Sequence, residues 1–327
     1  MTAPRGSGGG TRGETPPGGG GDWRTLNVSR RVGYRLLPGD LFSYVLHMRP
    51  REWPIMAGHT ALGFALAVGL RPALRGERFS ALAVALLVVV VLVNGGTLAI
   101  NSAFDRDAGD VGYLDAPPPV PRHLVAFSVA LMGVGIAVAE AVGGGFLVTT
   151  VVCVAMSLLY SVPPVRLKAV AGADWLVNMI GFGTLTPYAG WAVTGRPVTD
   201  VAAWTLVGFC PLFAALYPLT QLYQLDEDRA RGDRTLALAV GVAPSLALSV
   251  AATIAAFACF GRAAALADAS PLGRAGIALA FVAWLVVLGR WLVRRRRMTS
   301  RDHKRGMYLA LGAWALTDVA IVTALAT

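Results

Sequence analysis

The stretch ALAVALLVVVVLVNGGTLAI (residues 81–100) is followed directly by NSAFDRDAGD (residues 101–110). The first segment is an apolar run long enough to cross the hydrocarbon core of a bilayer as a helix. The second segment carries three aspartates. A charged side chain near the bilayer core costs roughly 2.5–3.5 kcal/mol on insertion scales, so such residues mark functional sites. The sequence therefore predicts a membrane-spanning helix whose polar end takes part in function.

The composition is that of a membrane protein. Of 327 residues, 55% are hydrophobic and 15% are charged, whereas a soluble domain carries about 25% charged residues. The net charge of +10 does not indicate a nucleic-acid binder, because the arginines lie between apolar runs and form no single basic face. The three cysteines lie inside apolar runs at no ligand-like spacing, and we interpret them as core residues.

Apolar runs of spanning length occur nine times and predict an all-α, polytopic membrane protein. The expected spans are 54–71, 79–101, 122–141, 145–161, 172–194, 201–223, 236–260, 273–293 and 307–326. Internal Gly and Pro in the fifth and seventh runs predict kinks. Residues 1–35, rich in Gly, Pro and Arg, are expected to form a disordered cytosolic tail. Residues 36–53 are expected to lie on the membrane surface as an amphipathic segment, and residues 54–327 to form one transmembrane domain.

Basic residues are distributed unequally between the two sides that these spans define. The tail and the loops after the even-numbered spans hold all Lys and Arg except Arg71, Arg75, Arg78, Arg196, Arg262 and Arg274. The positive-inside rule then places the N-terminus in the cytosol and the C-terminus outside. We expect a multi-pass protein of the cell membrane with its polar segments on the cytosolic side.

A second acidic cluster, QLYQLDEDRARGDRTL (residues 221–236), follows the sixth run and faces the same side. A polar stripe at helical spacing leads to each cluster. The first stripe is Asn94, Thr97, Asn101 and Asp105, and the second is Tyr217, Gln221, Gln224 and Asp228. Oxygen ligands without His or Cys suit Mg²⁺, which is commonly held by one or two carboxylates plus substrate phosphates. We therefore predict two facing clusters that hold Mg²⁺ and a diphosphate.

Basic side chains beside the clusters fit a phosphate ligand. Arg166 and Lys168 lie in YSVPPVRLK (residues 160–168), and Arg229 follows the second cluster. Arg166 and Lys168 also have a simpler interpretation as ordinary positive residues of a cytosolic loop. A diphosphate at the membrane surface above an apolar cavity indicates a prenyl diphosphate, which ionises with metal assistance to an allylic carbocation that the spans shield from water.

These features together resemble the UbiA superfamily of intramembrane prenyltransferases, over residues 49–326. Asn101 and Asp105 match its first motif, Asn-Asp-x-x-Asp-x-x-x-Asp, while Ser102 replaces the first Asp and Asp110 lies one residue beyond the last. Asp228 matches its second motif, Asp-x-x-x-Asp, and Gln224 stands at the leading Asp. RPREWP (residues 49–54) and YSVPPVRLK also resemble segments of the family.

The resemblance implies nine helices around a central cavity and a Mg²⁺-dependent transfer of a prenyl group to an acceptor such as an aromatic ring or quinone precursor. It implies metal ligands among Asn101, Asp105, Asp110, Asp226 and Asp228, with Asn101, Asp105, Asp110 and Asp228 acting in catalysis. The residues expected to bind the substrate are Tyr160, Arg166, Lys168, Gln224 and Arg229. Asp107 and Asp233 either replace missing ligands or are solvated loop acids.

Two other functions remain open at this point. A membrane terpene cyclase of the same superfamily would let the cation react with its own double bonds, and the altered motifs are compatible with it. A transporter would use the acids as an ion pathway. The sequence favours this less, because the acids lie at one mouth and no pair of interrupted helices occupies corresponding halves.

Overall fold

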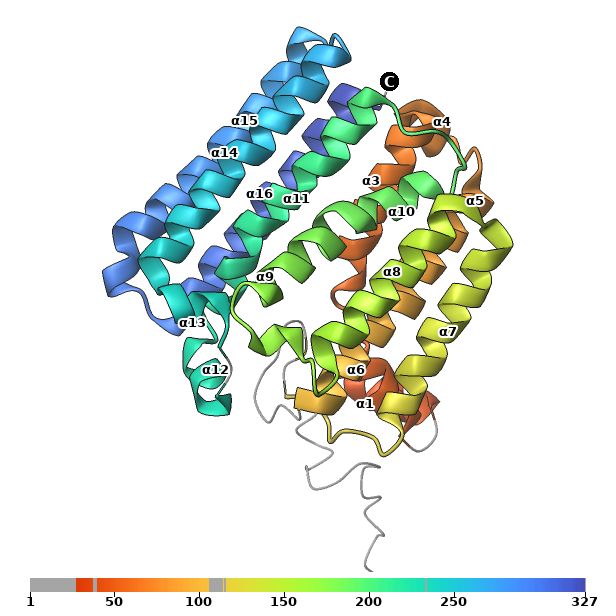
Figure 1. The fold of residues 1–327 in the computed structure, drawn as a ribbon, viewed down its shortest axis with the longest axis vertical. Helices are drawn as coiled ribbons and strands as arrows, with labels where there is room; N and C mark the ends of the chain where they lie inside the picture. The colour runs from red at the N-terminus through yellow and green to blue at the C-terminus, as the bar shows by residue number, and fades with distance from the viewer. Residues whose placement is uncertain (1–27, 38–39, 106–113, 115, 233, 327) are drawn as a thin grey trace, which may run out of the picture.

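The structure, a computed structural model, describes residues 28–37, 40–105, 114, 116–232 and 234–326 (Figure 1). Within these residues every regular element is helical. The elements up to the middle of the chain are α1 (Val28–Leu36), α2 (Leu41–His47), α3 (Trp53–Val68), α4 (Leu70–Leu74), α5 (Phe79–Ala85), η2 (Leu86–Asn94), α6 (Gly95–Asp105), α7 (Leu124–Val142) and α8 (Gly144–Ser161). The others are η3 (Leu167–Ala169), α9 (Ala173–Asn178), η4 (Met179–Leu185), α10 (Thr186–Ala192), α11 (Asp200–Gln221), α12 (Leu225–Arg231), α13 (Leu236–Val240), α14 (Val242–Leu266), α15 (Pro271–Arg294), η5 (Arg295–Arg297) and α16 (Ser300–Leu325).

Seven helices in the described part of the chain are long and apolar enough to cross a membrane. They are Phe79–Asp105, Leu124–Val142, Gly144–Ser161, Asp200–Gln221, Val242–Leu266, Pro271–Arg297 and Ser300–Leu325. The all-helical, multi-pass architecture is therefore confirmed. The first expected span is a shorter apolar helix, α3, and the fifth is divided among α9, η4 and α10. Nine spans thus stay a prediction.

The two larger of three hydrophobic cores in the described part of the chain organise the bundle. One joins α11, α14, α15 and α16 and buries Phe209, Leu246 and Trp284 completely. The other joins α3, η2, α7, α8 and α10 around side chains such as Phe64 and Phe146. Figure 1 shows α14 and α15 on one side of the molecule and α7 and α8 on the other, with α9 between them. The ends of α6 and α12, which carry the two acidic clusters, lie at the same end of the bundle.

Pro187 in the first turn of α10 and Pro218 in α11 each leave a backbone carbonyl without its helical donor, and side chains from other helices compensate. Pro187 has no N–H, so the Gly183 carbonyl four residues earlier lacks its usual helical donor. His59 Nε2 on α3 lies 3.3 Å from this oxygen. Likewise, Trp175 Nε1 donates at 2.9 Å to the carbonyl four residues before Pro218 in α11. Such substitutes are required where water is excluded.

Two helix boundaries differ from the sequence-based prediction. The last helix begins at Ser300, not at 307, because Thr299 and Asp302 form a capping box that starts it before the expected span. Within the expected tail, Val28–Leu36 forms the helix α1, and the disorder of the preceding residues stays a prediction. Tyr34 on α1 packs edge-on against Phe42 of α2, which gives this helix a partner. Residues 1–27 lie outside the described residues.

Candidate active site

A cavity of about 510 Å³ lies between the two cores and receives both polar stripes. Its wall includes every member of the first stripe, from Asn94 to Asp105, and every member of the second, from Tyr217 to Asp228. Helical periodicity had placed each stripe on one helix face, and the fold turns these two faces toward each other. The deeper wall is apolar and aromatic, with Phe182, Phe213 and Trp314 among its side chains.

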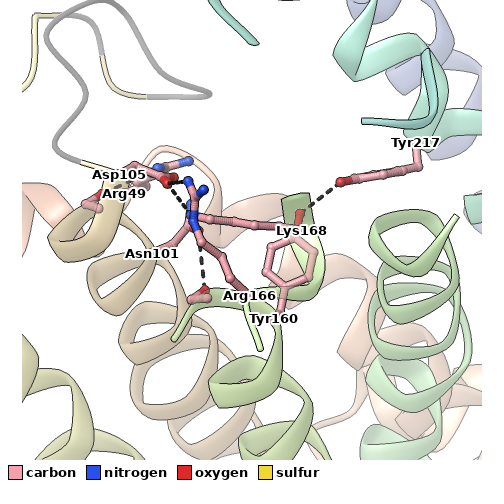
Figure 2. Close-up of polar contacts among 9 residues, drawn as sticks. Arg49, Asn101, Asp105, Tyr160, Arg166, Lys168 and Tyr217 are labelled. Carbon is pink, nitrogen blue, oxygen red and sulfur yellow. Dashed lines mark hydrogen bonds and ion pairs between the residues drawn. The ribbon is translucent and has the colours of Figure 1, made fainter. Parts of the chain in front are cut away.

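Asn101 and Asp105 on α6 form the first half of the site (Figure 2). The Lys168 ammonium contacts both, donating to Asn101 Oδ1 at 2.6 Å and to the Asp105 carboxylate. Arg166 Nη2 lies 3.1 Å from Asp105 Oδ1. Ser161 Oγ also donates to Asn101 Oδ1, at 3.3 Å. Arg166 and Lys168, expected beside the acidic clusters, thus contact the first one, and their role with phosphate stays a prediction.

A left-handed backbone places both basic side chains in this cluster. Arg166 has a φ of 38°, which bends the chain sharply between α8 and η3. Lys168 then follows in η3 with its side chain 8% exposed. A buried ammonium requires compensation by acidic or amide oxygens, and Asp105, 10% exposed, supplies it.

Tyr160 and Tyr217 join the two sides of the cavity. Their hydroxyl oxygens are 2.8 Å apart, with Tyr160 at the end of α8 and Tyr217 on α11 (Figure 2). Both residues line the cavity below the charged cluster. The pair therefore places two phenol groups between the charged cluster and the apolar part of the cavity.

Gln224 and Asp228 form the second half of the site. Gln224 is the N-cap of α12, and Asp228 lies one turn later and is 3% exposed. Thr235 Oγ1 donates to Asp228 Oδ2 at 3.4 Å. Gln224 and Asp228 both line the cavity, so the polar residue that replaces an acid of the family motif occupies the same wall as its partner.

Asp226 and Arg229 lie away from the cavity wall, and their roles as a metal ligand and a substrate-binding residue stay predictions. Their side chains are 87% and 67% exposed and pair with each other at 3.1 Å. Two residues apart on a helix means about 200° of rotation, so Asp226 points outward when Asp228 points inward. Asp107, Asp110 and Asp233 lie outside the described residues.

Several charged residues of the cavity wall escaped the sequence-based prediction. Arg49, Glu52 and Lys304 all line it. Arg49 is 8% exposed and donates to Ser102 Oγ at 3.4 Å. Burial raises the pKa of the Glu52 carboxyl to about 7, and the nearby Arg49 guanidinium opposes this shift. The resemblance of residues 49–54 to the opening segment of the family could have pointed to Arg49 and Glu52, whereas Lys304 lies outside that segment.

The polar residues of the cavity fit Mg²⁺ by chemistry. Within the described part of the chain, no three acidic, imidazole or thiol side chains gather closely enough to hold a metal alone. Asn101, Asp105, Gln224 and Asp228 nevertheless offer carboxylate and amide oxygens to one cavity. Mg²⁺ usually takes one or two carboxylates and completes its shell with phosphate oxygens and water. This set therefore suits a metal held jointly with a substrate.

Comparison with known proteins decides the family. The sequence model of the UbiA prenyltransferase family matches residues 53–312, which is most of the chain. This chain belongs to that family.

Curated relatives of this UbiA-family protein include a digeranylgeranylglyceryl phosphate synthase from Methanothrix thermoacetophila. The two are 28% identical over 243 residues, which cover 69% of this chain and 83% of the relative. A lycopene elongase/hydratase from Halobacterium salinarum is 29% identical over 222 residues, covering 63% of this chain and 74% of the relative. A solved UbiA homolog from Archaeoglobus fulgidus, bound to DMAPP and Mg²⁺, has a TM-score of 0.65 at 18% identity. That match covers 85% of this chain and 99% of the homolog, and it shows the shared fold.

Proposed function

We propose that this UbiA-family protein transfers a prenyl group from an isoprenoid diphosphate to an acceptor such as an aromatic ring or quinone precursor, with Mg²⁺. The observation that carries the proposal is the placement of both polar stripes on the wall of one cavity whose deeper part is apolar. The names of the curated relatives, a digeranylgeranylglyceryl phosphate synthase and a lycopene elongase/hydratase, support transfer of an isoprenoid group to an acceptor but name no aromatic one. The membrane-spanning helices suit a substrate with a long hydrocarbon chain.

The diphosphate end of the donor would lie between the two halves of the site. Asn101 and Asp105 face it from α6, and Gln224 and Asp228 face it from α12. When bound between them, Mg²⁺ would neutralise the diphosphate and make it a better leaving group. Lys168 and Arg166 would move from Asp105 to phosphate oxygens, which offer charge-assisted hydrogen bonds of the same kind.

The reaction breaks the bond between C1 of the prenyl chain and the diphosphate oxygen, and the electron pair leaves with the diphosphate. An electron-rich acceptor then forms a new carbon bond at C1 and loses a proton. The Tyr160–Tyr217 pair would border the reacting carbon, with Tyr160 hydrogen-bonding the head group. Phe213 and Trp314, whose ring centroids are 5.7 Å apart, would exclude water and offer their faces to the allylic cation.

Product analysis tests this proposal directly. Purified protein would be incubated with geranyl, farnesyl or geranylgeranyl diphosphate, with Mg²⁺ or EDTA, and with or without a phenolic acceptor. We expect a prenylated acceptor by mass spectrometry only with Mg²⁺. A cyclic hydrocarbon formed without acceptor would show a terpene cyclase instead. Cation-driven uptake into vesicles without any prenyl product would show a transporter.

A further inference from the structure

Asp174 is a completely buried carboxylate that lies outside the cavity wall yet close to it. It belongs to the first turn of α9 and is 0% exposed. Its Oδ1 accepts a hydrogen bond from the Gly172 N–H at 2.8 Å. Its Oδ2 accepts from Gln221 Nε2 at 2.6 Å and from the Leu236 N–H at 3.2 Å. The described part of the chain shows no ion pair to this carboxylate.

Neutral N–H groups at helix starts stabilise this charge. Gly172 is the N-cap of α9, and Leu236 is the first residue of α13. The N-terminus of a helix favours an anion, because its first N–H groups have no partner within the helix. Hydrogen bonds from such groups to a carboxylate are about twice as strong as those between neutral groups. A buried carboxylate with this set of donors therefore holds its neighbours in defined places.

Those neighbours belong to the two opposite halves of the diphosphate site. On one side, α9 follows closely after Lys168 in η3. On the other side, Gln221 ends α11 just before Gln224, and Leu236 follows Thr235, which contacts Asp228. Gln221 Oε1 also accepts from the Ala237 N–H at 3.0 Å, so its amide links both segments. Asp174 and Gln221 together connect the Lys168 turn (η3, Leu167–Ala169) to the Asp228 segment (α12, Leu225–Arg231, and the residues that follow it to Ala237).

We propose that Asp174 is a positioning residue of the diphosphate site, which fixes the Asp228 segment at a set distance from the Lys168 turn. This inference rests on the proposed function. Residues that support metal ligands from behind typically change metal affinity or activity by about 10–100-fold when they are removed. Loss of Asp174 should therefore raise the Mg²⁺ concentration that gives half-maximal diphosphate release.

A charge-exchange cycle separates positioning from general folding. Asp174→Asn removes the charge and one acceptor, and should raise half-saturating Mg²⁺ about 10-fold or more. Gln221→Glu alone should also impair the site, because two carboxylates would face each other. The double variant Asp174→Asn, Gln221→Glu restores one negative charge and an amide-to-carboxylate hydrogen bond. It should therefore show a half-saturating Mg²⁺ closer to wild type than either single variant.

Asp200→Asn is the matched control. Asp200 is also an acid in the first turn of a helix, α11, but it is exposed and lies outside the cavity wall. Its replacement should leave half-saturating Mg²⁺ unchanged. Diphosphate release would be measured per folded protein with geranyl diphosphate across a Mg²⁺ titration. Wild-type Mg²⁺ dependence in Asp174→Asn, or a double variant worse than both singles, overturns the proposal.

Hydrogen–deuterium exchange gives a readout that does not depend on activity. The amides of Leu236 and Ala237 donate to Asp174 and Gln221, so both should exchange faster in Asp174→Asn. Unchanged exchange at these amides would count against the role of Asp174. A wild type that releases no diphosphate would overturn the proposed function, and the exchange result would still decide the role of Asp174. If Asp174→Asn does not fold, Gln221→Met carries the same two measurements.

Discussion

Asp105 and Asp226 form a matched pair of acids that tests which carboxylates belong to the site. Asp105 is 10% exposed and contacts Lys168 and Arg166 at the cavity mouth. Asp226 is 87% exposed and pairs only with Arg229 among the contacts described for it. Asp105→Asn should greatly slow the release of diphosphate from an allylic substrate, whereas Asp226→Asn should leave it within about twofold of wild type, since exposed ion pairs contribute about 0–1 kcal/mol.

The size of the Asp105 effect follows from two consequences of losing one buried charge. Removing an electrostatic stabiliser from a low-dielectric site typically costs about 3–4 kcal/mol of transition-state stabilisation, or 10²–10³ in rate. The same change leaves Lys168, which is 8% exposed, with an amide oxygen in place of a carboxylate. Hydrogen bonds to charged groups contribute about 1.5–3 kcal/mol, so unfolding should also become easier by an amount in this range.

The two effects can be separated by measuring both rate and stability. Single-turnover diphosphate release would be followed across a Mg²⁺ titration, and thermal unfolding would be followed in the same detergent. Additional Mg²⁺ should partly restore the rate of Asp105→Asn by mass action, but it should not act on Asp226→Asn. A wild-type rate per folded molecule in Asp105→Asn, or an inactive Asp226→Asn, would refute the assignment of Asp105, and not Asp226, to the site.

Three shorter tests concern other parts of the molecule. Gln224→Asp should retain Mg²⁺-dependent turnover and Gln224→Leu should lose most of it, because this side chain and Asp228 both line the cavity. Full activity of the leucine variant in the diphosphate-release assay would show that Gln224 is only a packing residue. Glu52 has a folded-state pKa of about 7 against an ordinary value of 4.5, so wild-type stability should fall as pH rises between these values. Glu52→Gln should remove this decline, and melting curves that show no gain for the variant at pH 8 relative to pH 5 would contradict it. A reporter fused after Thr327 should be external and one at residue 1 cytosolic, whereas a cytosolic C-terminal reporter would contradict the expected topology.

Helical periodicity made the two stripes predictable, because the spacing of Asn94 to Asp105 and of Tyr217 to Asp228 fixes which side chains share a face. The same periodicity places Asp226 and Asp228 on opposite faces of a helix. Treating neighbouring acids as one cluster of ligands overlooks this difference. The bonds of Asp174 to Gln221 and Leu236 were not predictable, since they join residues far apart in the chain. Likewise, Pro187 signals a carbonyl without its donor, but only the fold shows that His59 lies beside it.

The departures from the family motifs change the charge balance of the cavity in a consistent direction. Ser102 stands where the first motif has its first Asp. It accepts a hydrogen bond from the buried Arg49. Among the described residues, no carboxylate forms an ion pair with Arg49. Gln224 likewise replaces an acid with a neutral amide at the second motif. Among the described residues of the wall, Arg49, Lys168 and Lys304 therefore face Asp105, Asp228 and Glu52, and burial raises the pKa of the Glu52 carboxyl to about 7.

Under the proposed function, the fixed cations of this wall would neutralise part of the bound diphosphate and so reduce the charge left for Mg²⁺. A buried guanidinium without a counter-ion has lost its hydration without compensation. A phosphate oxygen beside Arg49 would therefore gain from the attraction of opposite charges and would also supply the missing counter-ion. Fewer Mg²⁺ ions would then be needed for each diphosphate than in a site with both acids present. Restoring them, in Ser102→Asp combined with Gln224→Asp, should steepen the dependence of diphosphate release on Mg²⁺ concentration. An unchanged slope in the same titration would show that the replaced positions do not set the metal requirement.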